Sequence, residues 1–259
     1  MTVVLAVCCA DGVVLGSDSQ GTDISGGDIS VATKSTVQKL FPLGTHIAWG
    51  ATGGASIIQR FAHFCTTVDQ GVLDHPIEEL RATLSGFQRQ LQQQVHSEII
   101  QGFYGQQVPA LGPLFAGFTG GKPWILEVTP GGEDTVYEDF YAVGSAGAFA
   151  RQAMASVAHM DMPNRNLAEA QVIVWRALDD CIQAAAWGIG RPIWLYSVTA
   201  DGASTLDEDD WLGVGDSVNA WKEAERDSLI GLGLGVPVPE QPQEDAGIEP
   251  PPEESAPSS

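Results

Sequence analysis

Short apolar runs separated by turn residues fill the first fifty positions, which is typical of β-structure. They predict four strands in two hairpins, over residues 2–10, 13–18, 39–43 and 46–50. Asp11-Gly12 supplies the turn of the first hairpin. Residues 19–36 are rich in Ser, Thr, Gly and Asp, which favours a loop containing a short strand.

Beyond residue 54 the apolar positions recur at intervals of three and four, which indicates amphipathic helices. These intervals predict helices over residues 55–68, 76–100, 148–159 and 167–186. Apolar runs predict further strands over residues 114–118, 124–129, 136–143 and 192–199. The order is strands, two helices, strands, two helices, strands, and it predicts an α+β sandwich of stacked sheets flanked by helices.

Composition divides the chain into a globular domain, residues 1–235, and a tail, residues 236–259. The last 23 residues hold seven prolines and six acids, without Lys, Arg or an aromatic residue. Such a segment buries too little apolar area to order itself, so we expect a disordered acidic tail. The acidic run 207–210 lacks the glycine-punctuated spacing of a calcium loop, and we expect a solvated loop there.

The net charge of −21 disfavours nucleic acid or an anionic membrane surface as a partner, because phosphate binding needs clustered cations. No apolar run is long enough to predict a membrane span. The apolar start lacks the preceding positive charges of a secretory signal, which favours a cytoplasmic protein. The four cysteines have no zinc-ligand spacing, and no cofactor motif is present, so we expect reduced thiols, no metal and no cofactor.

Thr2 is the most informative position for chemistry. Its small side chain would allow removal of Met1, leaving a hydroxyl and a free α-amine on one residue as nucleophile and proton acceptor. Four local patterns follow it in order. They are an acid ending a strand (Asp18), a lysine entering an apolar strand (Lys39), a glycine before a helix (Gly50) and a serine at a strand–helix junction (Ser145). Taken singly, these are an ordinary turn acid, surface cation, packing glycine and helix cap.

Together, these residues resemble the proteasome β-subunit family of N-terminal nucleophile hydrolases, including its bacterial two-ring protease relatives. The likeness covers roughly residues 2–200, and its sharp matches lie in the first sixty residues and in 142–147. It implies a four-layer αββα sandwich and a peptide or protein substrate. It also implies a ring-shaped homo-oligomer, and substrate-binding positions at Gly21, Thr22, Ala48 and Thr52.

The resemblance also implies a role for each site residue. Thr2 would be the nucleophile, and Lys39 would lower the pKa of its α-amine. Asp18 would hold Lys39 as an ion pair. The Gly50 N–H would donate to the oxyanion of the intermediate, and Ser145 would orient the amine.

Two departures from the family pattern keep alternatives open. The Asp18–Lys39 interval is longer than usual and the Lys39–Gly50 interval shorter, so Lys34 is a rival for the site lysine. Residues 185–192 also lack the Asp and Ser that active members carry near the threonine. The leading hypothesis is a threonine-type peptidase or amidase, and the alternative is an inactive scaffold or ring-forming binding protein of the same fold.

Overall fold

The computed structural model describes residues 2–24, 32–102, 110–184 and 188–232. By their contacts the residues group into two units, Met1–Asn219 and Ala220–Ser259. Helix α6 (Glu208–Gly231) runs across the boundary between the units. The predicted domain boundary after residue 235 and the predicted disorder of residues 236–259 lie outside the described residues.

The described strands form two five-stranded antiparallel sheets and one two-stranded ribbon. The first sheet has the order β10 (Phe140–Val143), β1 (Val4–Cys9), β2 (Gly12–Ser17), β11 (Trp194–Thr199) and β12 (Gly202–Thr205). The second has the order β5 (Leu40–Pro42), β6 (Ile47–Gly53), β7 (Leu111–Thr119), β8 (Lys122–Val128) and β9 (Asp134–Tyr137). The ribbon pairs β3 (Gln20–Ile24) with β4 (Ala32–Thr36).

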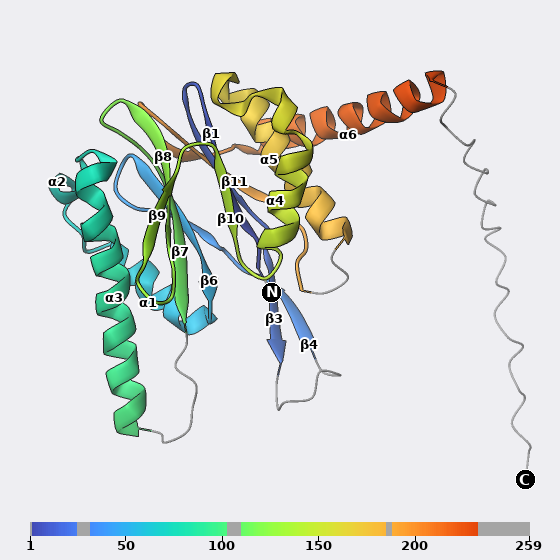
Figure 1. Cartoon of the computed structure of the whole chain (residues 1–259). Coiled ribbons are helices and arrows are strands. Elements are labelled where there is room, and N and C mark those ends of the chain that lie inside the picture. Colours follow the sequence, from blue (N-terminus) through green and yellow to red (C-terminus); the bar gives the residue numbers. More distant parts are fainter. Residues whose placement is uncertain (1, 25–31, 103–109, 185–187, 233–259) are drawn as a thin grey trace, which may run out of the picture. The chain divides into compact units, whose positions relative to one another are not determined.

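The two sheets pack face to face, and helices cover their outer faces (Figure 1). The second sheet is covered by α1 (Ala55–Cys65) and α3 (Ile77–Gly102), which are linked by the short α2 (Gln70–Leu73). The first sheet is covered by α4 (Gly147–Ser156) and α5 (Leu167–Ala184), with 3₁₀ turns at Ala158–Met160 and Met162–Asn164 between them. The predicted α+β sandwich with αββα layers is therefore confirmed.

Alternation along the strands builds two of the hydrophobic layers. Even-numbered residues of β1 and β6, such as Val4 and Ala48, lie between the sheets. Odd-numbered residues of β6, such as Trp49, point instead toward α1 and α3. There the Trp49 ring stacks on Phe41 with centroids 4.8 Å apart and meets Phe61 edge-on at 4.8 Å.

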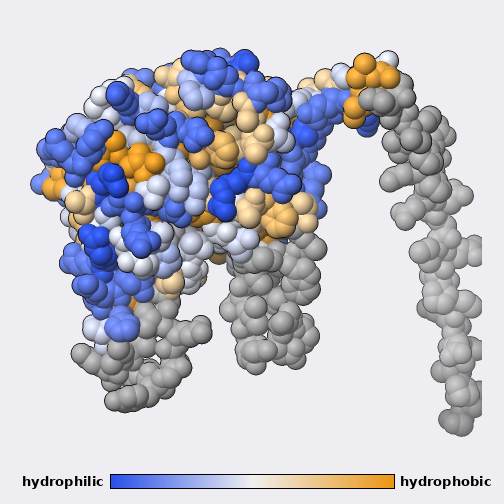
Figure 2. All heavy atoms as spheres, in the orientation of Figure 1, coloured by the Kyte–Doolittle hydropathy of each residue, from blue (hydrophilic) through white to orange (hydrophobic). Residues whose placement is uncertain are grey.

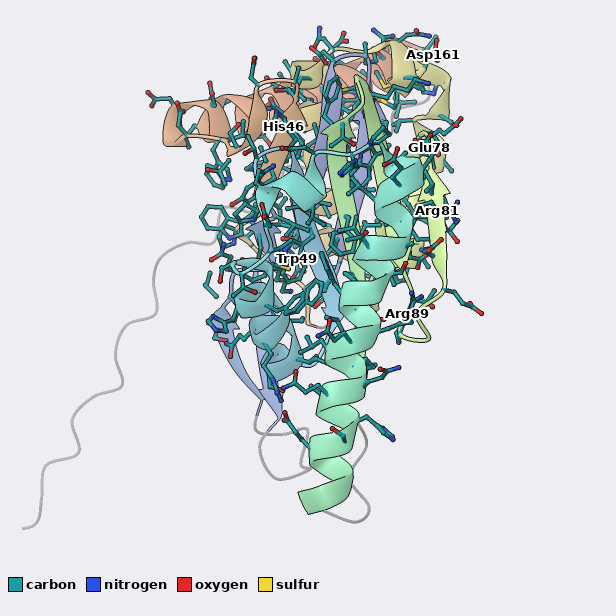
Figure 3. The ribbon with its side chains drawn as sticks, turned by 90° about the vertical axis from the view of Figure 1, so that its left-hand side faces the viewer. His46, Trp49, Glu78, Arg81, Arg89 and Asp161 are labelled. Carbon is teal, nitrogen blue, oxygen red and sulfur yellow. The ribbon has the colours of Figure 1, made fainter. Side chains whose placement is uncertain are left out.

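Two arginines tie α3 to the edge of the second sheet. Arg81 pairs with Asp134 at the start of β9, and Arg89 Nη1 donates to the Gly132 carbonyl at 3.0 Å. Figure 3 shows both arginines leaving α3 on the side of β9, while Trp49 lies between the helices and the sheet. These contacts lie away from the N-terminal strand and serve the packing of this layer.

Hydrophilic side chains cover most of the face shown in Figure 2. Apolar residues are exposed at a few places, among them the C-terminal end of α6, where Leu229, Ile230 and Leu232 are more than half exposed. No helix within the described ranges has the length and apolarity to cross a bilayer.

Three sequence-based assignments of secondary structure were wrong. Residues 136–143 are not one strand but the end of β9 and all of β10, which lie in different sheets. The break is stabilised at Asp139, whose carboxylate accepts from its neighbour Phe140 N at 2.7 Å and whose carbonyl accepts from Cys8 N at 2.7 Å.

The acidic run 207–210 begins helix α6 and is not a loop. The Asp207 carboxylate accepts from Asp210 N at 2.8 Å, which is the geometry of an N-cap. Acids in a first turn are also stabilised by the helix dipole. The segment 19–36 likewise holds two strands where one short strand was expected.

We expect Phe61→Ala to lower the free energy of unfolding by about 3–5 kcal/mol, because it leaves a cavity among packed rings. Phe61 is fully buried between Trp49, Phe64 and Phe115. Phe149→Ala is the matched control, since Phe149 is 50% exposed and its loss should change stability by about 0.5 kcal/mol or less. Urea unfolding of both variants measures the difference, and equal losses would contradict the assigned core.

Candidate active site

Asp18 is the centre of the candidate site. Its side chain is fully buried just after β2 and accepts hydrogen bonds from four separate places. Oδ1 accepts from Val3 N at 3.1 Å and from Lys39 Nζ at 2.7 Å. Oδ2 accepts from Gln20 N at 3.1 Å and from Gly190 N at 3.2 Å. These donors stabilise an ionised carboxylate in a buried position.

Lys39 approaches Asp18 from the residue before β5. Its side chain is 7% exposed, and Nζ donates to the Gln20 carbonyl at 2.8 Å as well as to Asp18. Burial lowers the pKa of the Lys39 ammonium from its usual value, and the Asp18 carboxylate opposes that shift. The predicted pairing of these residues is thus present in the geometry.

Thr2 and Ser145 are brought together by the pairing of β1 with β10. Thr2 N lies 3.1 Å from Ser145 Oγ and donates to it, while Ala146 N donates to the Thr2 carbonyl at 3.2 Å. Gly144 has a φ of +98°, and a Cβ there would lie 2.2 Å from the Thr2 carbonyl oxygen. Close approach of the N-terminal segment to this junction therefore requires glycine.

One cavity of about 520 Å³ contains both Thr2 and Lys39 in its wall. Phe41, Ala51 and Ile58 give the cavity an apolar side. Neutral amides line it too, from Gln20, Gln38 and Gln59. Lys39 is the one charged side chain among the described lining residues, and Asp18 already pairs with it. The cavity therefore offers a hydroxyl, a nearby cation and a largely neutral surface.

The structure does not bring Ala48 and Thr52 to this cavity. Ala48 is fully buried between the two sheets, and Thr52 Cγ2 packs beside Gly112 of β7. The sequence-based assignment ended the strand at Gly50, whereas β6 continues to Gly53. Successive residues of β6 face opposite sides of the sheet up to Gly53. The odd-numbered Ala51 and Gly53 therefore line the cavity, and the even-numbered Ala48 and Thr52 do not.

The other predicted positions, Gly50, Gly21 and Thr22, lie on β6 and on the β3–β4 ribbon. Gly50 is buried in β6 and pairs with Leu40, the residue after Lys39. Gly21 lines the cavity from the ribbon, where it pairs with Ser35. Thr22 pairs with Lys34 one step farther along, and the side chains of these two residues lie outside what the structure describes.

The segment 188–190 is a part of the site that sequence reasoning missed. Residues 185–187 lie outside the described part of the chain, but Gly190 N donates to Asp18 and Gly190 O accepts from Ser19 N at 3.1 Å. A main-chain N–H donor such as that of Gly190 cannot be recognised from the side chains in the sequence. The two glycines before Pro192 were the one available signal, and they do not specify a partner.

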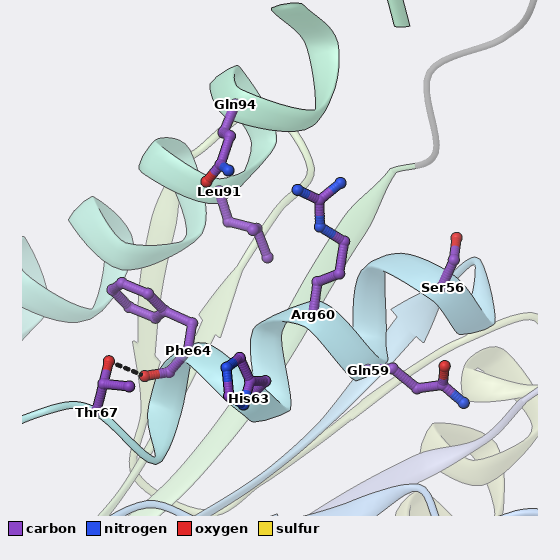
Figure 4. Close-up of a pocket in the computed structure, with 8 residues that line it drawn as sticks. All are labelled: Ser56, Gln59, Arg60, His63, Phe64, Thr67, Leu91 and Gln94. Atoms are coloured by element: carbon purple, nitrogen blue, oxygen red, sulfur yellow. Dashed lines mark hydrogen bonds between the residues drawn. The ribbon is translucent and has the colours of Figure 1, made fainter. Parts of the chain in front are cut away.

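A second hollow, of about 560 Å³, lies between α1 and α3 (Figure 4). Its guanidinium, Arg60, forms two hydrogen bonds to Glu98, at 2.6 and 2.8 Å. The Thr67 hydroxyl donates to the Phe64 carbonyl at 2.7 Å, shown dashed in Figure 4. The Arg60–Glu98 pair is exposed, whereas the Lys39–Asp18 pair is buried, so the Thr2 cavity is the better candidate.

Cysteine and metal chemistry have little support in the described residues. All four cysteines are buried and free, and burial raises the pKa of Cys8 to about 12, so its thiol is protonated at neutral pH. No group of three or more His, Cys, Asp or Glu in the described ranges could hold a metal ion.

A known protein family matches most of the chain. The model of the Proteasome family, described as proteasome subunit, matches residues 2–189. The matched range contains Thr2, Asp18, Lys39, Gly50 and Ser145, and it ends beside Gly190.

We expect Lys39→Met to destabilise the protein by about 3–5 kcal/mol, because it leaves a buried carboxylate without its counter-charge. The double variant Asp18→Asn, Lys39→Met removes both charges and should recover part of that loss. Urea unfolding of both single variants and the double variant measures the coupling. Additive losses would show that the two side chains do not stabilise each other.

Proposed function

Because the chain belongs to the proteasome subunit family, we propose that it is a threonine-type hydrolase of peptide or amide bonds. Thr2, exposed by removal of Met1, is the proposed nucleophile. The observation that carries the proposal is the buried Lys39–Asp18 pair, 2.7 Å apart, in the wall of the cavity that Thr2 also lines. An ion pair held at a cavity containing a hydroxyl is the arrangement that an amine-activated threonine needs.

In the proposed reaction, the free α-amine of Thr2 takes the proton of its own hydroxyl as the oxygen attacks the substrate carbonyl. The proposed role of the Lys39 ammonium is to favour the unprotonated form of that amine by charge repulsion. Ser145 Oγ, within hydrogen-bond distance of Thr2 N, orients it. The amine then gives the proton to the leaving nitrogen as the C–N bond breaks.

The first product is an acyl ester on the Thr2 oxygen, which water hydrolyses to regenerate the hydroxyl. The proposed oxyanion donor is the Gly50 N–H. Gly50 lies opposite Leu40 in the sheet, beside the residue that carries the cation. One donor of this kind contributes about 10²–10³-fold to the rate in other hydrolases.

The proposed substrate has an uncharged, apolar side chain next to the scissile carbonyl. Phe41, Ala51 and Ile58 would contact that side chain, and the amides of Gln20, Gln38 and Gln59 suit a peptide backbone. A carboxylate or ammonium in the cavity would lose water without gaining a free counter-charge. Gly21, on β3, is the proposed contact for the extended peptide.

Family membership also supports assembly, since proteasome subunits form rings. We propose that this chain forms a homo-oligomeric ring with the cavity facing its interior. A cytoplasmic location fits the sequence and remains a prediction.

A second candidate function is a non-catalytic ring subunit. One observation favours it: Gly188, Ile189 and Gly190 bring neither a carboxylate nor a hydroxyl toward Thr2, where a support for the nucleophile was expected. The Gly190 N–H supports Asp18 in its place. The two functions differ in whether Thr2 reacts.

Incubation with a peptide epoxide or β-lactone is expected to add one adduct to a protein that has lost Met1, because the Thr2 hydroxyl, with its own amine as base, attacks and opens the strained ring. Intact mass measures both events. Thr2→Ala should stay unlabelled, whereas Thr67→Ala, which removes a hydroxyl from the other hollow, should be labelled like the wild type. Retention of Met1, or an unlabelled protein, would support the non-catalytic subunit.

Reporter peptides that differ only in the residue before the cleaved bond test the substrate class. We expect leucine to exceed lysine and glutamate by about tenfold or more in kcat/KM, given the cost of burying an unpaired charge. Gln59→Glu places a carboxylate in the same wall and should raise the relative rate for lysine. Equal rates for the three peptides would overturn the proposed selectivity.

A further inference from the structure

The segment before β11 clamps the loop that carries Asp18. Gly190 donates to Asp18 Oδ2 at 3.2 Å and accepts from Ser19 N at 3.1 Å, so two backbone hydrogen bonds join the segments. A Cβ on Gly190 would lie 2.4 Å from Gln20 Oε1, which shows how closely the segment packs on Gln20. The Gln20 carbonyl in turn accepts from Lys39 Nζ.

An ion pair fixes the same segment to helix α5. Arg191, directly after Gly190, pairs with Asp179, whose side chain is 5% exposed. Gln183 Nε2 also donates to Asp179, at 2.8 Å. The Arg191 side chain is 53% exposed and reaches the buried carboxylate from the surface. The chain thus leaves α5 after Ala184 and is bound back onto it seven residues later.

We propose that the Arg191–Asp179 pair is a latch that holds Gly190 against Asp18, which makes both residues positioning residues for the Asp18–Lys39 pair. Without the latch the segment 188–191 opens more often, and Asp18 loses one of its two Oδ2 donors while it is open. The carboxylate then holds the Lys39 ammonium less firmly beside Thr2. The latch is a structural claim, and its effect on the reaction rests on the proposed function.

Among the observed contacts, the latch takes the place of the missing acid and serine. The family pattern expects side chains to support the threonine from this segment, and here a main-chain N–H contacts Asp18 instead. The position of a main-chain N–H depends on how firmly its segment is fixed to the rest of the fold. The ion pair of Arg191, the next residue, with the buried Asp179 carboxylate fixes this segment.

The test combines amide hydrogen exchange with the rate of Thr2 labelling in the full chain. Arg191→Gln removes the charge from a half-exposed position, and Asp179→Asn removes it from the buried one. In both variants we expect the amide exchange rates of Gly190 and Ser19 to rise about tenfold. This increase lies between that expected for loss of an exposed ion pair and that for loss of a buried one. Arg191→Lys should restore much of the protection.

With a peptide epoxide, the two variants should lower the maximal rate of Thr2 modification while the half-saturating epoxide concentration stays near the wild-type value. Arg165→Gln is the control, since it breaks an exposed pair with Glu169 at the start of α5. It should change neither exchange nor labelling. A folded Arg191→Gln protein with wild-type exchange at Gly190 would overturn the latch.

The outcomes separate the two proposals. Raised exchange with unchanged labelling would overturn the positioning role. Raised exchange in a protein whose wild type is never labelled would support the latch and overturn the proposed function. Raised exchange with slower labelling, both reversed by Arg191→Lys, is the expected result.

Discussion

The buried ion pair between Asp18 and Lys39 is the interaction on which the candidate site depends. Taking both charges out of water costs several kcal/mol each, and their attraction offsets this only with good geometry and satisfied hydrogen bonds. The structure meets this condition with three main-chain N–H donors on Asp18 and a carbonyl acceptor for Lys39. The pair therefore joins four segments: the residue before β1, the loop after β2, the residue before β5 and the segment before β11.

This dependence explains why the site lies at the edge of the sandwich. β1 and β2 are buried along their whole length, so they offer no room for a substrate. Where the strands end, main-chain groups are no longer paired within a sheet and become available to side chains. Asp18 uses such groups from Val3, Gln20 and Gly190. The sheets provide rigidity, and their ends provide the polar contacts.

Much of this arrangement could be predicted from the sequence. The resemblance of Asp18 and Lys39 to a known family pattern predicted their pairing, and helical spacing located α1, α3, α4 and α5. Ala48 was expected at the cavity because of the family resemblance, whereas strand alternation turns it into the space between the two sheets. The role of Gly190 could not be predicted, because it contributes a main-chain hydrogen bond, which no side chain in the sequence specifies.

Phe41 belongs to two parts of the molecule at once. Phe41 lines the cavity, and its ring stacks on Trp49, which in turn contacts Phe61. Replacing Phe41 with a smaller residue to admit bulkier substrates would also remove a stacking partner from the interior. At this position, a change in selectivity is therefore coupled to a change in fold stability. Substitution of a cavity glutamine such as Gln59 should alter selectivity with a smaller loss of stability than substitution of Phe41.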